Sequence, residues 1–149
     1  MRKAISMGMD KQALVDTVML GNARVGNDSF VHPDSQWALA DGGHVYDPAA
    51  AASLLDEAGY TETNADGIRL SADGAPLSFE VLVPSTAPLL QRTTQLVAEQ
   101  LKPLGIQLNP VALETAAIRA RRLPAAQFDY DAFVQPLESH THADPDGLY

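Results

Sequence analysis

The chain has 149 residues and no cysteine, and its 10 basic against 19 acidic side chains give a formal net charge of -9. The length is sufficient for one domain with its own core, and the lack of cysteine excludes disulfides and thiolate metal sites. Because nucleic acid and anionic membrane surfaces attract positive charge, the acidic balance argues against both as partners. No apolar run approaches the ~20 residues of a transmembrane helix, so membrane insertion is not expected.

Two helices are predicted in the first half of the chain. Asp10 is a candidate N-cap for a helix whose apolar residues share one face and which ends at Gly21. Asp47 caps a second helix, which begins at a proline and ends before Gly59. Residues 22–46 between them show no sustained period and are expected to form a long loop, which in compact domains is usually functional or packed on another part.

A hairpin and an alternation of helices and strands are predicted in the second half. Asp73-Gly74 separates two β-prone runs and indicates a hairpin turn. The expected elements are the runs 68–70 and 77–84, a helix capped by Ser85 or Thr86 that continues to 102, a strand at 106–111, a helix at 114–123 and a strand at 128–134. This order is typical of an α/β fold with helices layered on a mixed, mostly parallel sheet, connected by right-handed crossovers.

The helix predicted at 114–123 carries three arginines. We expect Ile118 and Leu123 to face inward and Arg119, Arg121 and Arg122 to be more exposed. An arginine group of this kind can bind an anion, but a solvated helix face is the favoured interpretation.

The most reactive set of side chains lies in the segment His140-Thr141-His142-Ala143-Asp144. Alternate histidines on an extended segment point to the same side and can chelate one metal, as in metallo-hydrolases in which zinc activates a water. A polar loop tip is the favoured interpretation, with a metal and an organic ligand as the alternatives. Since no phosphate loop or nucleophile elbow is present either, composition and motifs reveal no enzyme.

The N-terminus does not form a signal peptide. It carries two basic residues, but Gly8, Asp10 and Lys11 interrupt any apolar core that such a leader needs. We therefore expect either a cytoplasmic protein or a chain from which a segment has been removed.

Six segments in chain order carry a resemblance to one family. They are residues 2–15 (RKAISMGMDKQALV), 46–60 (YDPAAAASLLDEAGY), 66–77 (DGIRLSADGAPL), 100–106 (QLKPLGI), and 128–131 (FDYD) with 144–146 (DPD). Together they resemble motifs of the family 5 extracellular solute-binding proteins, the receptors of peptide and nickel ABC importers. Each motif is weak alone, but their order and spacing cover nearly the whole chain.

The resemblance implies a receptor of two α/β lobes that hold ligand in the cleft between them. Residues 1–149 then form a single domain, most of the C-terminal ligand-binding lobe, in a periplasmic-binding-protein-like fold. An oligopeptide or similar small solute, the ABC permease subunits and the missing lobe of the same chain are the implied partners. Catalysis and cofactors are not expected. The implied location is the periplasm, or the cell surface for a lipoprotein. The absence of a signal peptide is then expected because residues 1–149 would be a fragment of the longer receptor.

The family's closing motif departs from its usual form in this chain. Counting back from Pro145, Thr141 occupies the position of the aspartate that pairs with a peptide's α-amino group. A neutral hydroxyl cannot supply the negative charge that an ammonium group prefers, whereas Glu138 can. The resemblance therefore leads us to expect that the cleft is lined by Glu138, His140, Thr141 and His142, with Trp37 as a weaker candidate that either faces the cleft or covers the core. The alternative is a small metallo-hydrolase that uses His140, His142 and Asp144.

Overall fold

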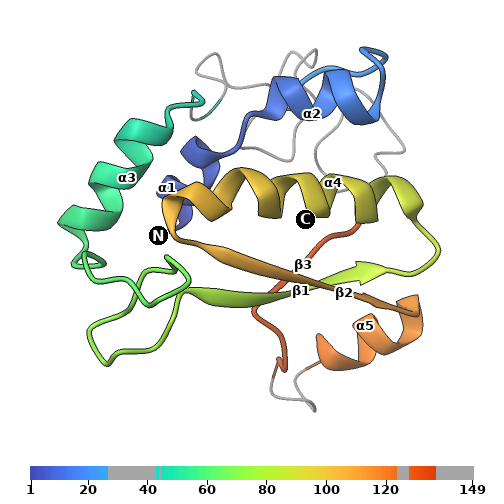
Figure 1. The fold of residues 1–149 in the computed structure, drawn as a ribbon. Helices are drawn as coiled ribbons and strands as arrows, with labels where there is room; N and C mark the ends of the chain where they lie inside the picture. Colours follow the sequence, from blue (N-terminus) through green and yellow to red (C-terminus); the bar gives the residue numbers. More distant parts are fainter. Residues whose placement is uncertain (27–42, 44, 124–127, 137–149) are drawn as a thin grey trace.

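The computed structural model describes residues 1–26, 43, 45–123 and 128–136. Within these ranges the chain forms helices on both faces of a three-stranded sheet (Figure 1). The elements in order are α1 (Arg2–Gly8), α2 (Lys11–Val18), α3 (Pro48–Glu57), β1 (Ser78–Pro84), α4 (Pro88–Leu101), the 3-10 helix η1 (Lys102–Leu104), β2 (Gln107–Leu113), α5 (Thr115–Arg121) and β3 (Ala132–Phe133).

The described strands are all parallel, in the order β2-β1-β3. The β1–β2 register runs from Ser78 opposite Gln107 to the ends of both strands, and Leu82 of β1 lies opposite Phe133 of β3. The predicted parallel pairing is confirmed. The connection through α5 passes across β1, so that β3 pairs with β1 and not with β2, its predecessor in the chain.

Helices cover both faces of the central strand. In Figure 1, α1 to α4 lie on one side of the sheet and α5 lies on the other, and both α4 and α5 contact β1. As a result Val81, Leu82 and Val83 are only 4%, 0% and 0% exposed. A strand buried on both faces shows a continuous apolar run, and this pattern is found in the second half of β1, at 81–84.

The main core lies among α1, α3, the end of α4 and the starts of β1 and β2. Its buried members are Ala4, Ala51, Leu55, Ile68, Leu77, Leu101, Leu104 and Ile106. The helix α1 was not among the predicted elements, which began at Asp10. It is short and has no side-chain cap, so packing stabilises it. A Cβ atom on Gly8 would lie 2.5 Å from Leu104 Cδ1 and 2.8 Å from Leu101 Cδ2, so the close approach of α1 requires a glycine there.

The predicted N-caps of two helices are confirmed, and that of a third is wrong. The Asp10 carboxylate accepts a hydrogen bond from Ala13 N–H at 2.9 Å, and the Asp47 carboxylate accepts one from Ala50 N–H at 2.9 Å. The helix α4, however, begins after Ala87 without a side-chain cap. The Ser85 hydroxyl, which we expected as its cap, instead donates to the Glu114 carboxylate at 3.0 Å.

The hairpin turn forms, but its first arm is not a strand. Leu70 and Pro76 make an antiparallel bridge across the turn, and Ser71 N–H donates to Ala75 O at 2.8 Å. On its other side this arm makes a second isolated bridge, from Arg69 to Thr63. The predicted strand at 68–70 is therefore one edge of a small loop structure.

The last described strand is much shorter than the predicted 128–134. The ladder contains only Ala132 and Phe133. The Asp131 side chain accepts the hydrogen bond from Glu80 N–H at 2.8 Å, so a carboxylate occupies the place of the next strand carbonyl. Phe128 has a positive φ of 54°, which is incompatible with a strand.

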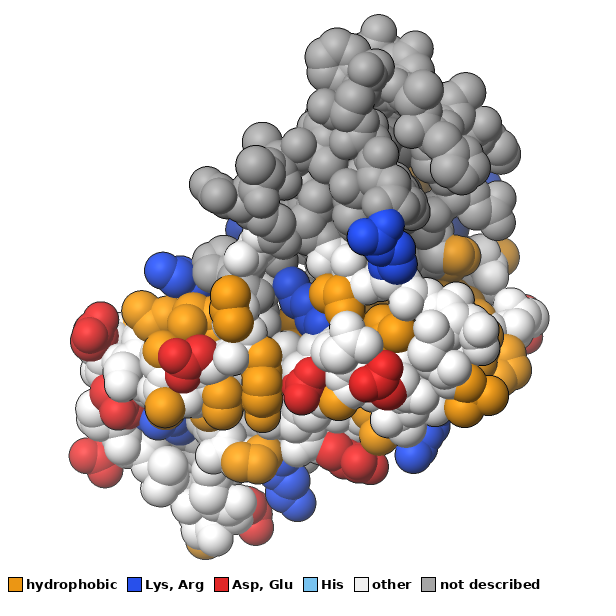
Figure 2. Space-filling model, turned by 90° about the horizontal axis from the view of Figure 1, so that it is seen from above, with side chains coloured by type: hydrophobic (Ala, Val, Ile, Leu, Met, Phe, Trp, Pro, Cys, Tyr) orange, Lys and Arg blue, Asp and Glu red, His pale blue; other side chains and the backbone are white. Residues whose placement is uncertain are grey.

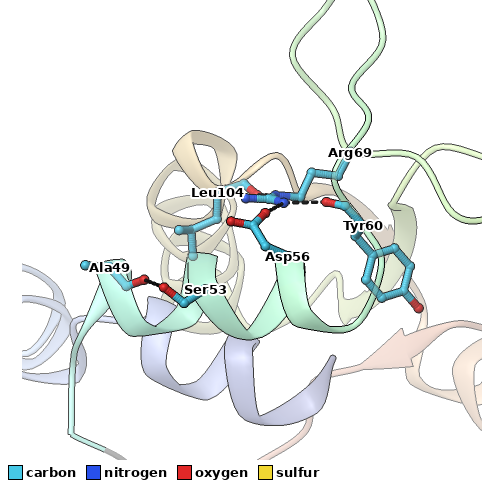
Figure 3. Close-up of polar contacts among 6 residues, drawn as sticks. All are labelled: Ala49, Ser53, Asp56, Tyr60, Arg69 and Leu104. Atoms are coloured by element: carbon cyan, nitrogen blue, oxygen red, sulfur yellow. Dashed lines mark hydrogen bonds and ion pairs between the residues drawn. The ribbon is translucent and has the colours of Figure 1, made fainter.

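Arg69 connects three separate parts of the fold (Figure 3). Its guanidinium donates to Leu104 O at 2.9 Å, to Tyr60 O and to the Asp56 carboxylate. Its backbone N–H donates to Gly105 O at 2.8 Å. The end of α3, the hairpin and the end of η1 are thereby held against one another.

The face of the molecule on the side of α1 to α4 carries apolar and acidic side chains next to one another. Figure 2 shows this face, where hydrophobic side chains are interleaved with acidic ones rather than separated from them.

Among the described ranges, no helix combines the length and the apolar character needed to cross a bilayer.

Replacing Arg69 with methionine is expected to lower the free energy of unfolding by about 2–3 kcal/mol, because two helix-end carbonyls lose a charged donor. Asp56→Asn is the control: its side chain is 54% exposed, and a pair of this kind contributes at most about 1 kcal/mol. Urea unfolding of both variants measures the difference. An equal loss of unfolding free energy in both variants would contradict the view that the carbonyl contacts stabilise the fold more than the ion pair does.

A second pair of variants tests the close approach at Gly105. Both Gly105 and Gly74 have positive φ, at 76° and 82°, so alanine costs about 1 kcal/mol at either position. At Gly105 the new Cβ would also lie 2.5 Å from Arg69 Cγ and 3.1 Å from Arg69 N, whereas it meets nothing within 4 Å at Gly74. Gly105→Ala should therefore destabilise by about 1–3 kcal/mol more than Gly74→Ala in thermal or urea unfolding.

Candidate functional site

A groove of about 1080 Å³ opens at the carboxyl ends of β1 and β3. Its walls come from the 84–87 loop after β1, from α5 with the two residues after it, and from residues 134–136 after β3. The carboxyl ends of parallel strands meet at one edge of a sheet. Here the chain leaves β1 toward α4 on one face and leaves β2 toward α5 on the other (Figure 1). Such a divergence is where open α/β sheets hold their ligands.

The rim at 84–87 is fixed by hydrogen bonds. The Gln91 side-chain amide donates to Pro84 O at 3.1 Å and to Ser85 O at 2.9 Å. Ser85 N–H donates to Leu113 O at 2.8 Å, which continues the β1–β2 ladder by one residue. The loop is therefore held by both the first turn of α4 and the end of β2.

The helix α5 is anchored beneath the sheet by one apolar and one charged side chain. Ile118 is 5% exposed and packs inward as predicted. Arg121 forms ion pairs with Glu80 at 2.6 Å and with Asp129 at 3.1 Å. Its hydrogen bond to Glu80 is the main reason that the pKa of Arg121 lies above its ordinary value. The expectation of a solvated arginine face is therefore wrong for this residue.

Arg122 is also held in place, but by uncharged partners. Its guanidinium carbon lies 3.7 Å from the centroid of the Phe133 ring, and one N–H group donates to the Gln135 side chain at 2.5 Å. Phe133 in turn packs edge-on against Tyr130, with ring centroids 5.4 Å apart. The guanidinium is thus positioned at the wall of the groove before any ligand binds.

Leu123 and Arg119 complete this wall. Leu123 is 51% exposed, so the prediction that it faces inward is wrong. The helix ends at Arg121 with Arg122 as its C-cap, so Leu123 lies beyond the helix and does not share the face of Ile118. Arg119 is exposed and, within the part of the chain that the structure describes, makes no hydrogen bond or ion pair.

The cleft residues expected from the resemblance lie outside the described residues. They are Trp37, Glu138, His140, Thr141 and His142, and the same holds for Asp144 of the alternative metal site. In the ranges that the structure does describe, no group of three or more histidine, aspartate or glutamate side chains is arranged to hold a metal ion.

Gln91 and Phe133, which support the groove, were not predicted as functional, and for Arg122 in its wall a solvated face was favoured over anion binding. Two features of the sequence nevertheless indicated this groove. The predicted parallel order places the ends of β1 and β3 at one sheet edge, and Arg119 and Arg122, three residues apart, share a helix face. What the pattern could not provide is which of the three arginines would find carboxylate partners.

The family model described as bacterial extracellular solute-binding proteins, family 5 Middle, matches residues 1–149. The nickel-binding periplasmic protein of Escherichia coli K12 is 25% identical over 154 residues, which cover 96% of this chain and 29% of that protein. The oligopeptide-binding protein AppA of Bacillus subtilis 168 is 29% identical over 149 residues, which cover 96% of this chain and 26% of AppA. The chain thus spans less than a third of the length of these relatives.

Solved structures share the fold. AppA of Bacillus subtilis in complex with a nonapeptide superposes with a TM-score of 0.73 at 27% identity, covering 90% of this chain and 27% of that one. NikA from Brucella suis in complex with Fe(III)-EDTA gives a TM-score of 0.67 at 31% identity, covering 86% and 25%. The predicted periplasmic-binding-protein-like α/β fold is confirmed.

These relatives are named as binding proteins, and none of them supports the metallo-hydrolase alternative. The match over residues 1–149, together with the shared fold, shows that the chain belongs to family 5 of the bacterial extracellular solute-binding proteins.

Proposed function

We propose that residues 1–149 form one domain, most of the C-terminal ligand-binding lobe of a two-lobe receptor that serves an ABC importer. The receptor captures an oligopeptide or similar small solute between its lobes and delivers it to the permease subunits without catalysis. Support comes from the family match and from relatives named for oligopeptide and nickel binding, of which this chain spans 26% and 29%. The receptor acts in the periplasm, or at the cell surface as a lipoprotein.

The observation that carries this proposal is the position of the groove along the chain. Pro136 lines the groove, and the segment with Glu138, Thr141 and His142 follows it directly in the sequence. A volume of about 1080 Å³ lies at the upper end of the range of small-molecule sites. The groove therefore supplies one wall of the cleft, and the expected ligand-binding segment begins at its rim.

The proposed transport cycle requires the other lobe. A single lobe presents only one wall of a cleft, so this chain alone should bind solute weakly. In the complete receptor, hinge closure would bury the solute between the two walls and create the closed form that the permease recognises. The lobe described here contributes a rigid wall, since its rim is fixed by Gln91 and Ser85.

The full-length receptor provides the test. Thr141→Ala and His142→Ala are expected to weaken binding of an oligopeptide library by about tenfold or more, because each removes a polar contact with the bound solute. Titration calorimetry gives the affinities. Thr61→Ala is the control, since Thr61 is exposed in the loop after α3, at the other end of the sheet. Unchanged affinity in both cleft variants would rule out this segment as part of the cleft.

A further inference from the structure

The helix α5 separates its three arginines into two kinds. Arg121 is paired with Glu80 and Asp129 beneath the sheet. Arg122 is held by an aromatic ring and a neutral amide, and Arg119 has no hydrogen-bonding or ionic partner among the described residues. Both of these line the groove, whereas Arg121 does not. Among the described residues neither of them has a carboxylate partner, so two positive charges line the groove.

The groove thus has the opposite sign to the chain as a whole. The formal net charge is -9, yet the residues described along the groove include Arg119 and Arg122 and no aspartate or glutamate. Clefts lined by one sign of charge concentrate the field between their walls and attract ligands of the other sign. A cationic groove on an acidic protein selects for a negatively charged group.

The arrangement of Arg122 suits a carboxylate in particular. Stacking on Phe133 covers one face of the guanidinium and Gln135 takes one of its N–H groups, which leaves the other donors in a fixed plane. A planar, preoriented guanidinium binds a carboxylate through two parallel hydrogen bonds. Arg119 lies one helical turn earlier on the same face, and the two like charges repel until an anion lies between them.

We propose that this groove recognises a carboxylate group of the solute, with Arg122 as the main anchor and Arg119 as the second donor. This inference rests on the proposed receptor function. The carboxylate comes either from a peptide C-terminus or from a polycarboxylate metal chelate.

The test uses the full-length receptor and three probes. They are a tetrapeptide library with free C-terminal carboxylates, the same library with C-terminal amides, and Fe(III)-EDTA. Arg119→Gln and Arg122→Gln are compared with Arg92→Gln, which makes the same charge change at an exposed site on α4 outside the groove. Native mass spectrometry and calorimetry measure binding, and thermal unfolding verifies the fold of each variant.

If the carboxylate comes from a peptide C-terminus, we expect the unaltered receptor to bind the free-acid library about tenfold more tightly than the amide library. If it comes from a metal chelate, we expect the unaltered receptor to bind Fe(III)-EDTA. Arg122→Gln should reduce that binding about tenfold and Arg119→Gln by a smaller factor, while Arg92→Gln leaves it unchanged. If Arg122→Gln unfolds, Arg119→Gln and Arg122→Lys carry the test, because lysine keeps the charge but loses the planar pair of donors.

Two results would overturn the inference in distinguishable ways. Binding of peptides with equal affinity for acid and amide, or binding that the groove variants leave unchanged, contradicts carboxylate recognition while the receptor function stands. Failure of the unaltered receptor to bind any of the three probes contradicts the proposed function and the inference together.

Discussion

The side chain of Arg69 is the contact on which the arrangement of this fold depends. Helix ends leave carbonyl groups without partners in their own helix, and Arg69 supplies donors to the carbonyls of Tyr60 after α3 and Leu104 at the end of η1. Its own backbone groups bond to Gly105 and Leu77. The end of α3, the hairpin with the start of β1, and the end of η1 therefore meet at one residue.

The backbone of Arg69 also bonds to the start of the sheet. Leu77 N–H donates to Arg69 O, and Gln107 N–H donates to Leu77 O, both within 2.9 Å, so β1 and β2 start in a defined alignment. That alignment continues without a bulge to Pro84 opposite Leu113, where the groove begins. The fold is held at the amino ends of the strands and the groove opens at their carboxyl ends. Exposed side chains in the groove can therefore change with little effect on the core, unlike the buried Ile118.

The parts of the fold that the sequence predicted are those determined by near neighbours. Asp47 caps α3 through a residue three positions away, and the order of helices and strands indicates the parallel sheet. The helix α1 was missed because it is held by tertiary packing of Gly8 against Leu101 and Leu104. The strand β3 is short because the Asp131 side chain bonds to Glu80, 51 positions away. Neither contact leaves a periodic pattern in the sequence.

Family membership can be read from local motifs in the sequence, whereas the residues that line the groove depend on how the chain folds. The motifs that resemble the family contain the turn glycines and Arg69, which organise the end of the fold away from the groove. A nickel-binding protein and an oligopeptide-binding protein accordingly match this chain at 25% and 29% identity over nearly the same residues. The groove depends instead on where residues lie around α5. Arg121 and Arg122 are adjacent, and a helix turns by ~100° per residue. One therefore pairs with carboxylates beneath the sheet while the next lines the groove, so the charge of the groove depends on helical position and not on a motif.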